Sequence, residues 1–194
     1  IDTDIAKGIN CMQFDKCENF IKAGVSSILD KKQSQFIEID DQIKALRKYF
    51  DDILSKTEKK SKTTEFVKIH KTTMGEISII ATEKRCTVLK NNLPSSQETI
   101  KYVSSSDKSE KSLNIDFTNI TFPKQSGNNK HICTPSIKML CENHFKFRNQ
   151  VSDCISNIYV EFIISLQKFS PEFSNISEYI STTDIIYNKA YIAK

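Results

Sequence analysis

Glycine and proline are scarce in this sequence, with only 4 of each among 194 residues. Short-stranded sandwiches and barrels need these residues at nearly every turn, because glycine reaches backbone conformations closed to other residues and proline fixes its own. The scarcity therefore favours long helices. We predict a mainly α fold, a disulfide-stapled helical bundle of four to five helices with room for a small β-hairpin in the middle region.

Apolar residues recur at helical spacing near the N-terminus. The most regular stripe, with steps of three and four, consists of Phe36, Ile39, Ile43, Leu46, Phe50 and Ile53. A coiled-coil dimer seam has the same spacing, but this stripe covers fewer than the three or four heptads that identify one, so we expect it to pack within the chain. An earlier stripe from Ile5 to Ile28 predicts a preceding helix, with a break near residues 29–33.

The longest predicted helix begins at Thr134-Pro135, where threonine can cap the helix and proline suits its first position. Its apolar stripe continues to Phe169, and Ser170-Pro171 ends it and begins a shorter last helix. The tail from Ile185 to Ile192 is apolar, but its pattern assigns no secondary structure.

The middle of the chain fits two interpretations. Residues 66–91 match a helix about as well as two β-branched strands, and we favour the helix. Leu113, Ile115 and Phe117 alternate with polar residues and form the best strand candidate. We expect loops near residues 94–112, which are serine-rich, and 123–132, within a single domain that spans residues 1–194.

The stretch from His131 to His144 holds the residues with the most chemical potential: His131, Cys133, Cys141 and His144. Zinc could take all four as ligands, but the spacing lacks the two-residue knuckle typical of zinc motifs. Cys133 could be a nucleophile at a helix N-terminus, but no glycine-rich turn offers an oxyanion hole. A structural role for the cysteines is the third interpretation, and the one we favour.

The chain has 6 cysteines, an even number that suits three disulfides in a secreted protein. They are Cys11, Cys17, Cys86, Cys133, Cys141 and Cys154. On helices, Cys11 and Cys17 would lie about 9 Å apart and Cys141 and Cys154 about 20 Å apart, beyond the roughly 7 Å that a disulfide spans. Neither pair can close on itself, so at least one of Cys11 and Cys17 should reach Cys86 or Cys133.

Charge and motif content exclude several function classes. The net charge of +4 comes from lysine, and the arginines that read phosphates and bases best are only Arg47, Arg85 and Arg148. We therefore expect no nucleic-acid partner. No apolar run reaches the roughly 20 residues of a membrane span, and no nucleotide-binding, zinc-protease, serine-hydrolase or calcium motif occurs. Adjacent acids such as Asp40 and Asp41 point to different helix faces, so we interpret them as solvated surface charges.

These observations lead by elimination to a secreted or extracellular helical protein, effector-like or an ectodomain, that binds another protein without catalysis. We expect a monomer with no cofactor and no metal. Asn119 and Asn175 lie in acceptor sequons, which predicts glycosylation at these sites. The alternative is a carrier of a small apolar ligand or lipid between the helices, with Ile185, Ile186, Tyr187, Tyr191 and Ile192 as its lid.

Overall fold

Helix α1 (Ser27–Thr57) supplies part of the buried core in this computed structural model, which describes residues 21–57 and 65–193. Ser26 caps the helix, since its hydroxyl accepts a hydrogen bond from the Leu29 N–H at 3.3 Å. The predicted stripe is confirmed and faces the core, where its members Ile43, Leu46 and Phe50 are buried together with Leu54, which the stripe did not include. The break predicted near residues 29–33 is wrong, because the helix continues through them.

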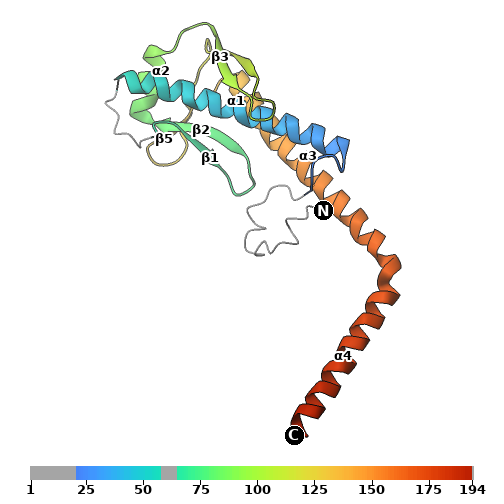
Figure 1. Ribbon diagram of the computed structural model, residues 1–194. Coiled ribbons are helices and arrows are strands. Elements are labelled where there is room, and N and C mark those ends of the chain that lie inside the picture. Colours follow the sequence, from blue (N-terminus) through green and yellow to red (C-terminus); the bar gives the residue numbers. More distant parts are fainter. Residues whose placement is uncertain (1–20, 58–64, 194) are drawn as a thin grey trace. The chain divides into compact units, whose positions relative to one another are not determined.

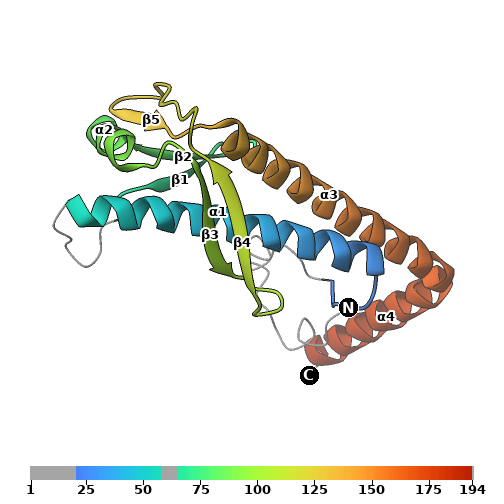
Figure 2. The same cartoon turned by 90° about the horizontal axis from the view of Figure 1, so that it is seen from above.

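Two small antiparallel sheets lie on opposite sides of α1 (Figures 1 and 2). The first has the strand order β1-β2-β5, and its strands are β1 (Lys68–Lys71), β2 (Ile77–Thr82) and β5 (Asn129–His131). The second is a hairpin of β3 (Gln97–Val103) and β4 (Glu110–Asp116), with Ile100 paired with Leu113. The strand predicted around Leu113 and Ile115 is confirmed as β4, and its partner β3 lies within the stretch expected to be a loop.

The helix favoured for residues 66–91 is wrong over residues 66–82, about two thirds of that stretch. Strands β1 and β2 lie there, and helix α2 (Glu83–Asn92) follows them. The chain reverses in a turn where the Gly75 N–H donates to the Thr72 carbonyl, and Gly75 has a φ of +90°. That backbone conformation favours glycine, so Gly75 suits the turn that joins β1 and β2 into an antiparallel hairpin.

The core forms where α1, α2 and both sheets meet. Phe50 and Phe117 are almost fully buried with ring centroids 5.9 Å apart, and the Tyr49 ring stacks on Phe117 at 5.8 Å. Such aromatic pairs add stability beyond their buried area. Cys86 and Leu89 of α2 belong to the same cluster, so a predicted disulfide cysteine serves as a core residue instead.

The C-terminal helices lie close to where the sequence predicts them. Helix α3 (Pro135–Leu166) begins as predicted, with the Thr134 hydroxyl accepting from the Ile137 N–H at 3.1 Å. A turn of 3₁₀-helix (Gln167–Phe169) follows it, and α4 (Ser170–Ile192) begins at the predicted Ser-Pro pair and includes the whole apolar tail. Contacts divide the chain into two compact units, residues 1–152 and 153–194. We call residues 153–193 the arm and describe it by itself.

The predicted disulfide-stapled helical bundle is therefore wrong. Two sheets accompany the helices, and the four cysteines within the described residues are free: Cys86, Cys133, Cys141 and Cys154. Cys11 and Cys17 lie outside the described residues. The scarcity of glycine and proline misled the prediction because the β3–β4 turn uses serine, aspartate and lysine, with Lys108 at a φ of 58°.

Candidate functional site

The residues of the His131 to His144 stretch do not converge on one site. His131 lies in β5 opposite Ile80, whereas His144 is buried on α3 and faces α1, with its ring centroid 4.9 Å from that of Phe36. Within residues 21–57 and 65–193, no group of three or more His, Cys, Asp or Glu side chains could hold a metal ion. The two histidines considered for zinc thus lie apart, His131 in the sheet and His144 at the α1–α3 contact, while Cys133 pairs with Thr121 in an isolated β-bridge and Cys141 packs against the core.

Burial shapes the chemistry of two of the free thiols. It raises the pKa of Cys86 and of Cys141 to about 11, and the neighbouring Cys133 adds to the effect at Cys141. A nucleophilic cysteine needs the opposite shift, because the thiolate is the reactive form. Cys86 and Cys141 are therefore suited to packing and poorly suited to nucleophilic attack.

His144 takes part in an ion-pair group between α1 and α3. Its Nε2 lies 3.6 Å from the Asp40 carboxylate, which also pairs with Lys44 at 2.5 Å. The contact with His144, followed by that with Lys44, lowers the pKa of Asp40. The Nδ1 atom of His144 is buried and has no hydrogen-bond partner among the described residues.

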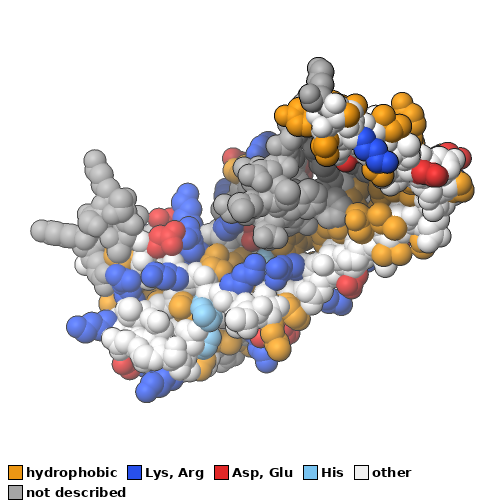
Figure 3. Space-filling model, turned by 90° about the horizontal axis from the view of Figure 1, so that it is seen from below, with side chains coloured by type: hydrophobic (Ala, Val, Ile, Leu, Met, Phe, Trp, Pro, Cys, Tyr) orange, Lys and Arg blue, Asp and Glu red, His pale blue; other side chains and the backbone are white. Residues whose placement is uncertain are grey.

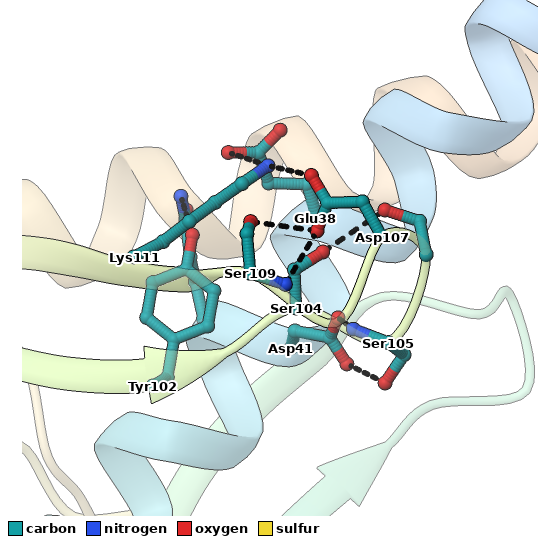
Figure 4. A network of polar contacts seen from close by, with 10 residues as sticks. Glu38, Asp41, Tyr102, Ser104, Ser105, Asp107, Ser109 and Lys111 are labelled. Carbon is teal, nitrogen blue, oxygen red and sulfur yellow. Dashed lines mark hydrogen bonds and ion pairs between the residues drawn. The ribbon is translucent and has the colours of Figure 1, made fainter.

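A polar network fastens the β3–β4 turn to α1 (Figure 4). Asp41 is buried, and its two carboxylate oxygens accept from the Ser105 N–H at 2.6 Å and the Ser105 hydroxyl at 2.7 Å. Within the turn, Asp107 accepts from the Ser109 N–H and hydroxyl, and these bonds lower its pKa to about 2. Asp41 is thus an internal anchor, and its interpretation as a solvated surface charge is wrong.

The arm carries most of the exposed apolar surface of the described residues. From Ser156 onward none of them is buried, and apolar side chains cover much of the part of α4 seen in Figure 3. The large exposed apolar residues of the arm are Tyr159, Val160, Phe162, Ile163, Ile164, Phe169, Phe173, Ile176, Tyr179, Ile180, Ile185, Ile186, Tyr187, Tyr191 and Ile192. Monomeric soluble proteins rarely expose an apolar patch of this extent, and larger ones mark interaction sites.

On α4 the apolar residues form a defined stripe, which we call the α4 seam. It follows steps of three and four and consists of Phe173, Ile176, Ile180, Thr183, Tyr187 and Tyr191. A groove of about 330 Å³ runs along it, lined by Tyr179, Ile180, Thr183, Asp184 and Tyr187. The same spacing on α1 predicted a buried face correctly, so the sequence contains the seam but does not say that it is exposed.

The remaining residues singled out from the sequence lie on the surface. Asn119 and Asn175 are exposed, the first in a turn after β4 and the second on α4, and glycosylation there stays a prediction. Ile185, Ile186 and Tyr187 are each more than half exposed, so they do not form a closed lid over a ligand in this structure.

Comparison with protein-family models, curated proteins and solved structures finds no match to this chain. A search of the helices over the described residues finds none long and apolar enough to cross a membrane.

Proposed function

We propose that this chain is a protein-binding module and that the α4 seam is the surface that contacts an apolar groove or helix of the partner. One observation carries the proposal: Phe173, Ile176 and Ile180 are each more than half exposed although they follow a regular buried-face spacing. Apolar residues at i, i+3, i+4 and i+7 are the anchors of helix-in-groove recognition. Burying them releases about 25 cal/mol per Å² of apolar area, which favours association.

The charges of the arm favour a protein partner over a membrane surface. Residues 153–193 carry five acidic and two basic side chains, a net charge of −3. Amphipathic helices that lie on membranes are rich in Lys and Arg, which attract anionic lipids. The acidic arm lacks this attraction, and it suits a partner whose groove is edged by basic side chains.

The prediction of a secreted protein depended partly on disulfide bridges, and the described cysteines are free. Localisation is therefore not part of the proposal. The absence of catalysis and the monomeric state also stay predictions.

Site-specific photo-crosslinking tests the proposal. A benzophenone amino acid is placed at Tyr187 in the seam, and in a control chain at Glu178, which lies on the opposite side of α4. In extract of the source cells we expect a discrete crosslinked protein from position 187 and not from position 178. Its purified form should bind the chain, and Ile180→Glu should weaken binding at least about tenfold, whereas Ser181→Glu should not.

Two results would contradict this account. Equal crosslinking from both positions would show that the seam is not a specific surface. Equal affinity of the Ile180→Glu and Ser181→Glu chains for the captured protein would show that the contact lies elsewhere. Sedimentation velocity over a range of concentrations identifies the case in which the captured partner is a second copy of this chain.

A further inference from the structure

Arg148 is a half-buried cation on α3. Its guanidinium makes no hydrogen bond or ion pair with any other described residue, although it carries five N–H donors. It extends from α3 to the β1–β2 turn, where its Nη1 lies 1.9 Å from the position that a Cβ on Gly75 would occupy. A side chain at position 75 would require the guanidinium to shift, and the positive φ of Gly75 by itself favours glycine there.

A cavity of about 110 Å³ adjoins this arginine between α1 and α3. Its lining is Gln33 and Phe36 from α1 and Arg148, Val151 and Ser152 from α3. A single water needs only about 10–15 Å³ by this measure, so the cavity has room for a larger group. The wall combines hydrogen-bond donors with an aromatic ring and an aliphatic side chain, a mixture typical of small-molecule sites.

A buried polar atom without a hydrogen-bond partner among the described residues, the Nδ1 of His144, lies on the same side of α3 as Arg148. His144 is one helical turn before Arg148 on α3, and its ring packs on Phe36, which lines the cavity. Its buried Nδ1 has no hydrogen-bond partner among the described residues. Buried polar atoms are nearly always paired, so an exception calls for an explanation.

The charges around the cavity select the kind of ligand. None of the five lining residues is acidic, and the nearby Asp40 is engaged by Lys44 and His144. A guanidinium binds carboxylate and phosphate groups through two parallel hydrogen bonds, a geometry that a cation or an alcohol cannot use.

We propose that Arg148, together with Ser152 and Phe36, forms a binding site for a small oxyanion, either a carboxylate or a phosphate. The guanidinium would hold two oxygens, the Ser152 hydroxyl would donate to a third where there is one, and Phe36 and Val151 would cover the carbon skeleton of an organic acid. This site is independent of the α4 seam and of the proposed function.

Nuclear magnetic resonance of the full ¹⁵N-labelled chain tests the site. The Arg148 Nε–H signal is followed during titration with inorganic phosphate and, separately, with benzoate, against potassium chloride at equal ionic strength. We expect saturable shifts with one or both probes and none with chloride. Saturation by benzoate alone identifies the ligand class as organic carboxylates, and saturation by phosphate alone identifies it as phosphates.

Matched variants separate this site from general charge attraction. Arg148→Met and Lys146→Met each remove one positive charge from α3, but Lys146 is exposed and does not line the cavity. Binding, read from the wild-type-like signals of Ser152 and Phe36, should weaken at least about tenfold in Arg148→Met and little in Lys146→Met. Arg148→Lys keeps the positive charge but loses the paired N–H donors of the guanidinium, so its affinity should lie between those of the two methionine variants. It replaces Arg148→Met in the comparison if that variant does not fold. Equal loss in both methionine variants, or no probe shifting the Arg148 signal beyond the chloride control, would overturn the proposal.

Discussion

The carboxylate of Asp41 is the strongest link between the β3–β4 turn and α1, so its removal offers a sharp test of the fold. In Asp41→Ala, the Ser105 N–H and hydroxyl both lose their acceptor. The two residues are 64 positions apart in the sequence, so the bonds fix a long-range contact. We expect the turn to detach from the helix more easily.

The size of the effect follows from the number and kind of bonds. Each hydrogen bond to a charged group contributes about 1.5–3 kcal/mol net. Ser105 is exposed, so water can replace the lost acceptor in part. Two such bonds sum to about 3–6 kcal/mol, and with the solvent replacement we expect Asp41→Ala to lower the free energy of unfolding by about 2–4 kcal/mol, around and below the lower end of that range. Ser105→Ala, which keeps the N–H bond, should lower it by about 1–1.5 kcal/mol.

Urea denaturation measures these losses, and amide hydrogen exchange locates them. Asp52→Ala is the matched control, since Asp52 is an exposed acid on the same helix. Exchange should accelerate in β3 and β4 of the Asp41 variant before it does in α1. A loss below about 0.5 kcal/mol, equal to that of the control, would refute the anchoring role, because surface substitutions fall in that range.

Three further outcomes are expected. Because the pKa of Asp40 is lowered in the folded state, its stabilising contribution is present above the unfolded value near 3.8 and is lost as pH falls through the folded value. Asp40→Asn should therefore flatten the fall in stability to urea between about pH 5 and pH 3. An unchanged profile would count against the His144 and Lys44 contacts. Cys86, with its pKa raised to about 11, should react with iodoacetamide at pH 8 about a hundredfold more slowly in the native chain than after unfolding, as followed by mass spectrometry; a native rate near the unfolded one would contradict its burial. Phe50→Ala should cost about 3–5 kcal/mol in thermal or urea unfolding, because the ring is fully buried against Phe117; a cost under about 1 kcal/mol would mean that the core is placed wrongly.

The sequence predicted best those features that depend on neighbours along the chain. The caps at Thr134 and Ser170-Pro171 and the stripe from Phe36 to Ile53 gave correct helices, because helical hydrogen bonds join residues four apart. The β4 strand was recognised from alternation over a few residues. The predicted disulfide bridges were wrong for the four described cysteines, because an even cysteine count says nothing about whether two thiols come within bonding distance.

The candidate site depended far more on distant contacts. Asp41 and Asp52 look alike in the sequence. Asp41 becomes an anchor only because Ser105 packs next to it in the folded chain, whereas Asp52 stays exposed to solvent. Arg148 gave no local signal, since the cavity beside it is made by residues of α1 more than a hundred positions earlier. Gly75, beside which its guanidinium lies, comes from a turn that the sequence alone placed in a helix.

The amino-acid sequence by itself determined where the helices begin and end and which of their faces are apolar, because these properties depend on short-range periodicity and capping. Only the tertiary structure decided which apolar face is buried: the stripe on α1 is covered by two sheets, while the equally regular seam on α4 stays exposed. An apolar helix face is buried only when another part of the structure packs against it, and the periodicity of one helix does not say whether such a part exists.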